Sequence, residues 1–140
     1  MNTIVLDPTQ DPGQDIALRR IHEHKSIAAP AAFRFEVDAN GIGWLTFDMP
    51  GASVNVFNES TLRELDDHLE AIESDPTLKA LVIRSAKEKV FIAGADLKAI
   101  RALPPAKLEA FIQLGQSVFT RLAALPMPKV AAIHGACVGG

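Results

Sequence analysis

Two apolar segments that each run into glycines restrict the possible folds of this chain more than any other feature. The first is Phe91–Lys98, FIAGADLK, and the second is Val130–Gly140, VAAIHGACVGG. A buried strand that opens into a glycine turn lets backbone N–H groups come close to a ligand, because no Cβ stands in the way. Two such turns can direct two N–H donors at one oxygen, which is the geometry that stabilises an oxyanion.

The rest of the chain alternates between strand and helix patterns. Strand patterns cover Phe33–Val37, Ile42–Phe47, Leu78–Arg84 and Val130–Ile133, and helix patterns begin at Asn58 and at Pro104-Pro105. The order is β-β-α-β followed by α-β, with no internal repeat in the sequence. This order predicts an open α/β layer structure.

Local signals support these elements. Asn40-Gly41 between the first two strands predicts a hairpin with a type I′ turn. Asn58 can cap a helix that Asp75-Pro76 ends, and the apolar run Ala80–Ile83 predicts a strand buried on both faces. The predicted inward residues are Leu62, Leu65, Leu69 and Ile72 in the first helix, and Leu108, Phe111, Ile112, Gly115, Val118, Phe119 and Leu122 in the second.

Length and charge exclude some classes of function. A chain of 140 residues is long enough for one domain with a core. Its net charge of −3, without a Lys/Arg cluster, argues against nucleic acid as a partner. The sequence has no signal-peptide pattern and no apolar stretch long enough to span a bilayer, and Cys137 is its only cysteine. We therefore expect a cytoplasmic protein without a membrane span.

The N-terminal residues differ from the rest. Residues 1–31 contain the helix and strand breakers Asp7-Pro8, Pro12-Gly13 and Ala29-Pro30. We expect a partly mobile extension over 1–31 and a domain over 32–140 that is incomplete, because its last strand ends in glycines with nothing to cover its far side.

The histidines and the cysteine are expected to have no catalytic or metal-binding role. His134 lies within the last predicted strand, before the turn, so a structural, hydrogen-bonded histidine is favoured over a general base. Cys137, between small residues, is expected to pack as a small apolar group. No metal site is expected, since His22, His24 and His68 have neither cysteine partners nor metal-ligand spacing.

Both glycine segments resemble the two signature segments of the enoyl-CoA hydratase/isomerase (crotonase) family. Together with Met49-Pro50-Gly51 and Val54-Asn55, the residues of these segments are most similar to those of one subgroup of that family. This subgroup is the hydratase domain at the N-terminus of the large multifunctional subunit of bacterial fatty-acid oxidation complexes. The resemblance covers about residues 32 to 140, and it implies a spiral of ββα units of which this chain holds the N-terminal part.

The resemblance also implies roles for individual residues. The backbone amides of Ala95 and Gly140 would form the oxyanion hole for the thioester oxygen of an acyl-CoA. The substrate-binding residues would be Ala93, Gly94, Ala95, Asp96, Lys98 and Gly139, with Lys98 near a CoA phosphate. No cofactor is implied, since CoA enters as part of the substrate and any NAD site would lie outside this chain.

One departure from the family leaves the activity open. The two glutamates that hold and activate water in these hydratases would follow Gly140, so neither is in this sequence. The leading interpretation is the oxyanion-hole half of an enoyl-CoA hydratase of fatty-acid β-oxidation. The alternatives are an isomerase or another CoA-thioester enzyme of the same fold, or a non-catalytic CoA-binding or interaction fragment. An oligomer or multienzyme complex is expected for the full-length protein.

Overall fold

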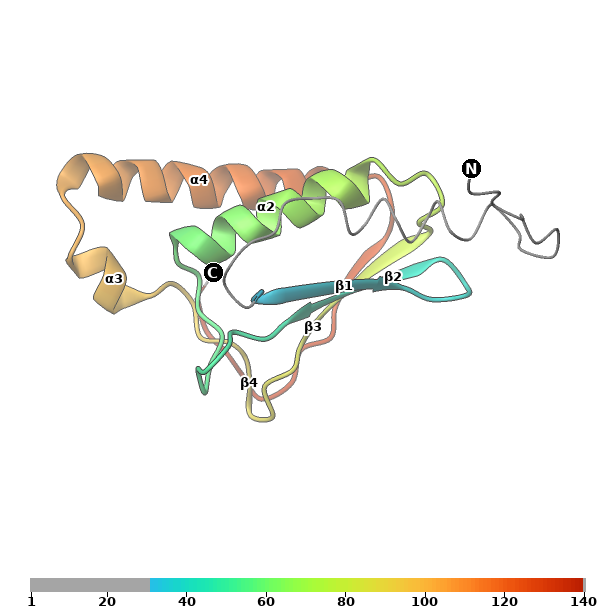
Figure 1. Cartoon of the computed structure of the whole chain (residues 1–140), viewed down its shortest axis with the longest axis horizontal. Coiled ribbons are helices and arrows are strands. Elements are labelled where there is room, and N and C mark those ends of the chain that lie inside the picture. Colours follow the sequence, from blue (N-terminus) through green and yellow to red (C-terminus); the bar gives the residue numbers. More distant parts are fainter. Residues whose placement is uncertain (1–30, 140) are drawn as a thin grey trace, which may run out of the picture. The chain divides into compact units, whose positions relative to one another are not determined.

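The structure, a computed structural model, describes residues 31–139. Nearly all of the expected extension, 1–30, and the predicted site residue Gly140 lie outside this described part. The six predicted elements follow one another in the predicted order (Figure 1). The strand Val90–Ile92, the short helix Leu97–Arg101 and the strand Ala136–Cys137 are additional to that order. Together the elements are β1 (Phe33–Val37), β2 (Ile42–Phe47), α2 (Glu59–Glu73), β3 (Ala80–Ser85), β4 (Val90–Ile92), α3 (Leu97–Arg101), α4 (Pro105–Ala124), β5 (Lys129–Ala131) and β6 (Ala136–Cys137).

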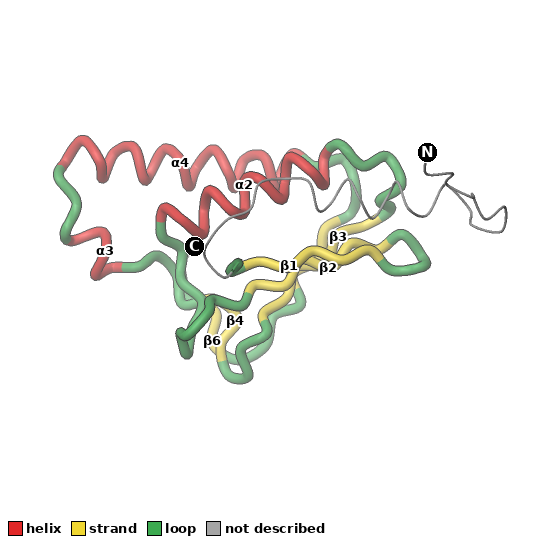
Figure 2. The backbone as a smooth tube through the Cα atoms, in the orientation of Figure 1, coloured by secondary structure: helices red, strands yellow, loops and turns green. Residues whose placement is uncertain are grey.

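The strands form two sheets, and helices cover one face of the larger sheet. The larger sheet has the order β1-β2-β3-β5, with β1 antiparallel to β2 and the other neighbours parallel. Helices α2 and α4 lie side by side over one of its faces (Figure 1). Strands β4 and β6 pair in parallel as a second, smaller sheet (Figure 2).

The chain repeats one path through these layers. Strands β3 and β5 belong to the larger sheet, and each is followed by a strand of the smaller sheet, β4 or β6. Strand β2 is likewise followed by Asn55–Phe57, which bonds to residues 93–96 beyond β4. Three successive segments of the chain, Asn55–Phe57, the β4 region and β6, therefore lie side by side in a second layer, with helices between them in the sequence.

Helix α2 forms as the sequence predicts. The Asn58 side chain accepts a hydrogen bond from the Thr61 N–H, and the Thr61 hydroxyl accepts one from the Asn58 N–H, which closes a capping box. The apolar stripe is buried against the sheet, and its members are Leu62, Leu65, Leu69 and Ile72. The predicted N-cap at Asn58 and the predicted buried stripe are both present, so the prediction of this helix is confirmed.

The hairpin between β1 and β2 has a different turn from the one predicted. The Gly41 N–H donates to the Asp38 carbonyl at 3.0 Å, so Ala39 and Asn40 are the central residues of the turn. Gly41 follows them with φ 82°. A three-residue connection in which a glycine in the left-handed region follows the turn replaces the predicted type I′ turn, although the hairpin itself is confirmed.

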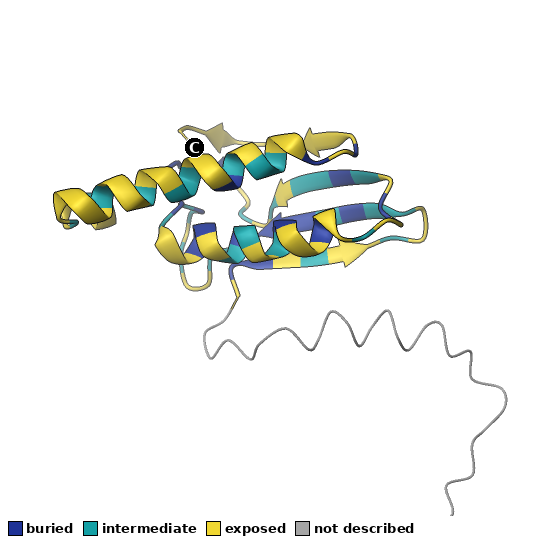
Figure 3. Cartoon of the chain, turned by 90° about the horizontal axis from the view of Figure 1, so that it is seen from above, coloured by how far each residue is buried: buried dark blue, intermediate teal, exposed yellow. Residues whose placement is uncertain are grey.

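Burial is lower than predicted in three elements. In β3 only Leu81 is fully buried, whereas the sequence predicts two buried faces. In α4 only Val118 is buried and Ile112 is 48% exposed, because one end of this long helix extends past the sheet (Figure 3). Strand β5 is exposed along its length, since its outer edge has no neighbour within residues 31–139.

Candidate functional site

The structure joins the two glycine segments directly. The Ala136 N–H donates to the Lys89 carbonyl and the Val138 N–H to the Ile92 carbonyl, both at 3.0 Å. These bonds place β6 beside β4 in the smaller sheet (Figure 2). Two segments that are far apart in the sequence thus lie side by side as paired strands.

Glycine is needed where the two segments touch. Gly94 has φ 85°, and a Cβ on it would lie 2.8 Å from the Val138 carbonyl oxygen. Gly139 has φ 66°, and a Cβ there would lie 3.2 Å from the Gly94 Cα. Both the positive φ and the short separation exclude a larger residue without movement of the backbone.

The segment after β4 is also bonded to the turn before it. The Ala93 N–H donates to the Asn55 carbonyl at 2.8 Å. The Phe57 N–H donates to the Gly94 carbonyl and the Asp96 N–H to the Phe57 carbonyl, again at 2.8 Å each. Residues 93–96 are therefore hydrogen-bonded to Asn55 and Phe57 on one side, and Gly94 contacts Val138 and Gly139 on the other.

This pairing determines which way the Ala95 N–H points. Ala95 is the bridge partner of Phe57, and the bonds to Phe57 come from the residues on either side of it. In a parallel bridge of this kind the middle residue directs its own N–H to the opposite side. Within the described residues, the Ala95 N–H makes no hydrogen bond. Among residues 31–139, therefore, an N–H donor without an acceptor lies at the junction of the two segments.

Gly94 allows that orientation. The N–H groups of residues i and i+2 in an extended strand point the same way, so the Ala93 bond to Asn55 would turn the Ala95 N–H toward the same side. The left-handed φ of Gly94 interrupts the alternation between them. The chain can then bond to Asn55 and Phe57 and still present the Ala95 N–H on the other side.

The other predicted binding residues have structural surroundings of their own. Asp96 is the N-cap of α3, and its Oδ1 accepts hydrogen bonds from the N–H groups of Lys98 and Ala99 at 3.0 Å each. Lys98 is exposed in the first turn of α3. Ala93, Gly94 and Ala95 lie together beside Gly139, so all the described site residues come from one junction.

Asn55 is a residue of this junction whose importance sequence reasoning missed. It is 0% exposed and its side-chain amide contacts three segments. Its Nδ2 donates to the carbonyls of Phe47 and Phe91 and to the Ser85 Oγ, at 2.9, 3.3 and 2.9 Å. The only sequence signal was an isolated asparagine between apolar residues, which does not reveal its partners.

His134 is hydrogen-bonded, as predicted, but it does not lie in a strand. Strand β5 ends at Ala131, and the Ile133 N–H then bonds back to the Ala131 carbonyl at 3.0 Å, which turns the chain. The exposed His134 ring lies in the following loop, with Nε2 2.6 Å from the Lys87 carbonyl. Since a carbonyl oxygen only accepts, Nε2 is the donor, and the ring anchors this loop to the one before β4.

Cys137 does not pack as predicted. It is exposed on β6, because no described segment covers that side of the smaller sheet. No group of three or more His, Cys, Asp or Glu side chains within residues 31–139 has the arrangement of a metal site. Among the described helices, none has the length and apolar character required to cross a membrane.

An ion pair supports the loop that His134 contacts. The Lys87 side chain is largely buried, and its ammonium lies 2.7 Å from both the Asp48 carboxylate and the Met49 carbonyl. Arg34 approaches the same carboxylate at 3.3 Å from a more exposed position. The hydrogen bond from Lys87 is the main cause that holds the pKa of Asp48 below its ordinary value.

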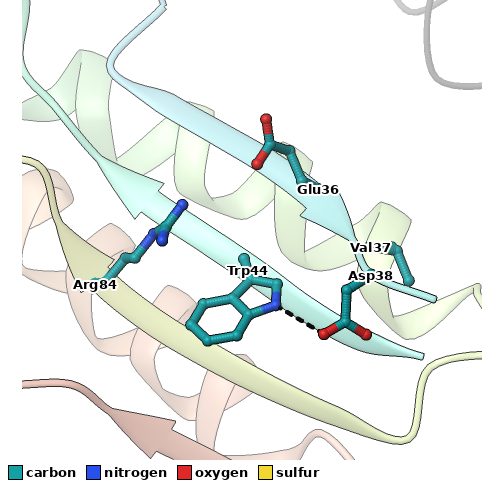
Figure 4. A pocket seen from close by; sticks show the side chains of 5 residues that line it. All are labelled: Glu36, Val37, Asp38, Trp44 and Arg84. Carbon is teal, nitrogen blue, oxygen red and sulfur yellow. Dashed lines mark hydrogen bonds between the residues drawn. The ribbon is translucent and has the colours of Figure 1, made fainter. Parts of the chain in front are cut away.

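Two hollows lie outside the junction itself. One of about 260 Å³ borders Asp96, and its lining is Asn58, Glu59, Ser60, Asp96, Ala99, Ile100, Leu103 and Phe111. The other, of about 430 Å³, contains no predicted site residue, and its lining is Glu36, Val37, Asp38, Trp44 and Arg84 (Figure 4). There the Trp44 indole donates to Asp38 and the Arg84 guanidinium lies 5.2 Å from the Trp44 ring centroid, so these groups already satisfy one another. The glycine junction remains the better candidate site.

Comparison with known proteins identifies the family of this chain. Residues 38–140 match the family described as Enoyl-CoA hydratase/isomerase. The chain is 40% identical over 110 residues to the fatty acid oxidation complex subunit alpha of Idiomarina loihiensis, covering 78% of this chain and 16% of the relative. It is 43% identical over 102 residues to the subunit of the same name from Shewanella sp. strain W3-18-1, covering 72% and 14%.

Solved structures share the fold. An enoyl-CoA hydratase from Mycobacterium smegmatis aligns with a TM-score of 0.70 and 29% identity, over 76% of this chain and 41% of that one. An enoyl-CoA hydratase/carnithine racemase from Magnetospirillum magneticum aligns with a TM-score of 0.71 and 26% identity, over 79% and 42%. The predicted crotonase-like α/β fold is confirmed, and the chain spans about one sixth of the curated relatives' length. The chain belongs to the enoyl-CoA hydratase/isomerase family.

Proposed function

We propose that this chain provides the thioester-binding half of an enoyl-CoA hydratase, which converts 2-trans-enoyl-CoA to 3-hydroxyacyl-CoA in fatty-acid β-oxidation. The observation that carries the proposal is the Ala95 N–H, which has no acceptor within the described residues and lies where the two glycine segments meet. The matched relatives, named as alpha subunits of fatty acid oxidation complexes, support the pathway.

The chemistry explains why such a donor matters. Addition of water to C3 of a 2,3-unsaturated thioester moves negative charge onto the thioester oxygen as an enolate forms. Donors that already point at this oxygen stabilise the charge without reorganisation, and removal of one typically lowers the rate by about 10²–10³. The Ala95 amide would supply one hydrogen bond and the Gly140 amide the second.

The remaining residues have supporting roles in this proposal. Gly94 and Gly139 allow the close approach of the two segments, and Ala93 holds the register. Asp96 fixes the start of α3, which leaves the exposed Lys98 ammonium available for a CoA phosphate. CoA belongs to the substrate, so we propose no separate cofactor, and an NAD site would belong to another part of the protein.

Acid and base catalysis must come from residues outside this sequence. In the family these are two glutamates after Gly140, and such a pair contributes about 10²–10⁴ in rate. We propose that they follow this segment in the complete cytoplasmic protein, which acts within an oligomer or multienzyme complex. The 140-residue chain by itself would then bind acyl-CoA thioesters without efficient turnover.

A pair of assays tests this proposal. The complete protein should hydrate crotonyl-CoA, seen as loss of the absorbance of the conjugated thioester, faster than it moves the double bond of a 3-enoyl-CoA. The 140-residue chain should bind acetoacetyl-CoA more tightly than free CoA. Preferential double-bond migration would assign an isomerase instead, and equal affinity for the two CoA ligands would remove the thioester site from this chain.

A further inference from the structure

We propose that Asn55 is a positioning residue, whose side chain and carbonyl together hold the Ala95 N–H in the direction needed to meet a ligand oxygen. The chemical meaning of that direction rests on the proposed function. The positioning itself rests on the hydrogen bonds around Asn55 and can be tested separately.

The Asn55 side chain is completely buried and uses both ends of its amide. Its Oδ1 accepts a hydrogen bond from the Met49 N–H at 2.9 Å. Its Nδ2 faces the Phe47 carbonyl, the Ser85 hydroxyl and the Phe91 carbonyl. One side chain therefore connects the end of β2, the end of β3 and the middle of β4.

Only an amide fits these partners. An acceptor is required on one side and an N–H donor on the other, and among side chains of this size asparagine has both. Aspartate would place a second acceptor against the Phe47 and Phe91 carbonyls. Alanine would leave the Met49 N–H without a partner, and the Phe47 carbonyl would keep only the hydrogen bond from the Ala86 N–H. An unpartnered polar group away from water is costlier than the loss of an ordinary surface bond.

Asn55 fixes two consecutive points of the segment that leads to Ala95. Its side chain holds the Phe91 carbonyl, and its own carbonyl accepts the Ala93 N–H at 2.8 Å. Because both of these groups are held, the change in the alternation of N–H directions occurs at Gly94, whose φ is 85°. The next residue is Ala95, with its N–H turned away from the Asn55–Phe57 segment.

Ser85 extends the same network. Its hydroxyl accepts from Asn55 Nδ2 and from the Lys87 N–H, and it donates to the Val90 carbonyl at 2.8 Å. Ser85 thus ties the end of β3 to the start of β4. Removal of this hydroxyl weakens the network while the Asn55 bonds to Met49 and Phe47 remain, which makes Ser85→Ala a milder variant.

Amide hydrogen exchange, measured by NMR on the whole chain, tests the positioning. In the wild type the Ala93 and Asp96 amides should be protected, and the Ala95 amide should exchange quickly. In Asn55→Ala the protection at Ala93 and Asp96 should fall at least about tenfold relative to the protection of the α2 amides. Ser85→Ala should show a smaller fall at the same amides, and it replaces Asn55→Ala if that variant does not fold.

The control is Ile72→Val, a buried change in α2 far from this network in the chain. Because it lowers stability in general, this variant should lower the protection of all amides by similar factors, with no additional loss at residues 93–96. If Asn55→Ala shows the same uniform loss of protection, or leaves the Ala93 and Asp96 amides protected, Asn55 only contributes to overall stability and the proposal is wrong.

A second measurement connects positioning to binding. Bound acetoacetyl-CoA should show the ultraviolet absorption of its enolate, because donors at the thioester oxygen favour that form. This signal, per bound ligand, should decrease in Asn55→Ala and Ser85→Ala but not in Ile72→Val. If the wild type does not bind acetoacetyl-CoA, the proposed function fails for this chain, and the exchange pattern still decides the role of Asn55.

Discussion

Gly94 and Val138 touch across the junction of the two glycine segments, with the space for a Gly94 Cβ only 2.8 Å from the Val138 carbonyl oxygen. The contact joins Gly94, whose left-handed φ precedes Ala95, to Val138, which lies between strand β6 and Gly139. A change at Gly94 should therefore disturb both halves of the site at once.

We expect Gly94→Ala to destabilise the protein more than Gly51→Ala. Both glycines have positive φ, which costs an alanine about 1–2 kcal/mol. A Cβ on Gly51 has no neighbour within 4 Å, whereas one on Gly94 must displace the Val138 carbonyl. Urea unfolding of the two variants measures the difference in stability, and equal losses would mean that the contact with Val138 contributes nothing.

Asp96 should act through its hydrogen bonds to α3 rather than through its charge. Asp96→Asn keeps a capping oxygen for the Lys98 and Ala99 amides, so stability and acetoacetyl-CoA affinity should change little. Asp96→Ala removes the cap and should cost about 1 kcal/mol. Thermal unfolding and a titration with acetoacetyl-CoA distinguish the cap from the charge. A loss of affinity in Asp96→Asn would show that the carboxylate contacts the ligand.

Lys87→Met should be clearly destabilising. The Lys87 side chain is only 14% exposed, and its ammonium bonds to the Asp48 carboxylate and the Met49 carbonyl, so we expect a loss of about 1–3 kcal/mol. Arg63→Met is the control, because its pair with Glu59 is exposed on both sides and is worth about 0.3–0.5 kcal/mol. Denaturant midpoints at pH 7 give both values, and similar small losses would place the Lys87 pair among ordinary surface pairs.

His68 should make the stability fall as the pH decreases below neutrality. Burial lowers the pKa of His68 below its ordinary value of 6.5, although Glu64 and Asp67 act in the opposite direction. Below pH 6.5 the unfolded chain then binds a proton that the folded chain does not, so stability is lost as the pH falls from 6.5 to the folded-state pKa.

The variant His68→Phe keeps an aromatic contact with the Phe33 ring, 6.2 Å away, and removes the titration. Urea unfolding between about pH 7.5 and 5.5 should show a steeper loss for the wild type than for this variant. Parallel curves would mean that other groups carry the pH dependence.

The free edge of β5 should promote self-association of the isolated chain. Val130 and Ile133 are 57% and 59% exposed, next to a strand edge that has no partner within residues 31–139. Val130→Lys should lower the fraction of dimer and larger species in sedimentation velocity runs. Val37→Lys, at an exposed apolar residue of β1, is the control, and an entirely monomeric wild type would contradict the prediction.

How far the sequence predicts this structure depends on how local each feature is. The α2 helix follows from its own residues, since Asn58 caps it and the stripe from Leu62 to Ile72 has helical spacing. The hairpin was predictable, but its turn was not, because Asn40-Gly41 suits more than one turn type. The exposure of Ile112 and Cys137 depends on which elements cover them, which no local pattern contains.

The candidate site shows the same division. The two glycine segments are visible in the sequence, and the structure places Gly94 of the first against Gly139 of the second. The direction of the Ala95 N–H depends instead on bonds to Phe57, in a different turn of the chain. The role of Asn55 likewise arises from partners at Phe47, Ser85 and Phe91, whose proximity exists only in the fold.

The parallel pairing of the larger sheet has a consequence for the folding kinetics. Ile42 pairs with Ala80 and Leu81 with Lys129, so each parallel pair forms only after a long connection that contains a helix has closed. The β1–β2 hairpin and α2 need no such closure, whereas contacts between residues distant in sequence slow the search for the native state. The glycine junction depends on the last of these closures, because β6 follows β5, and the candidate site is therefore expected to form late.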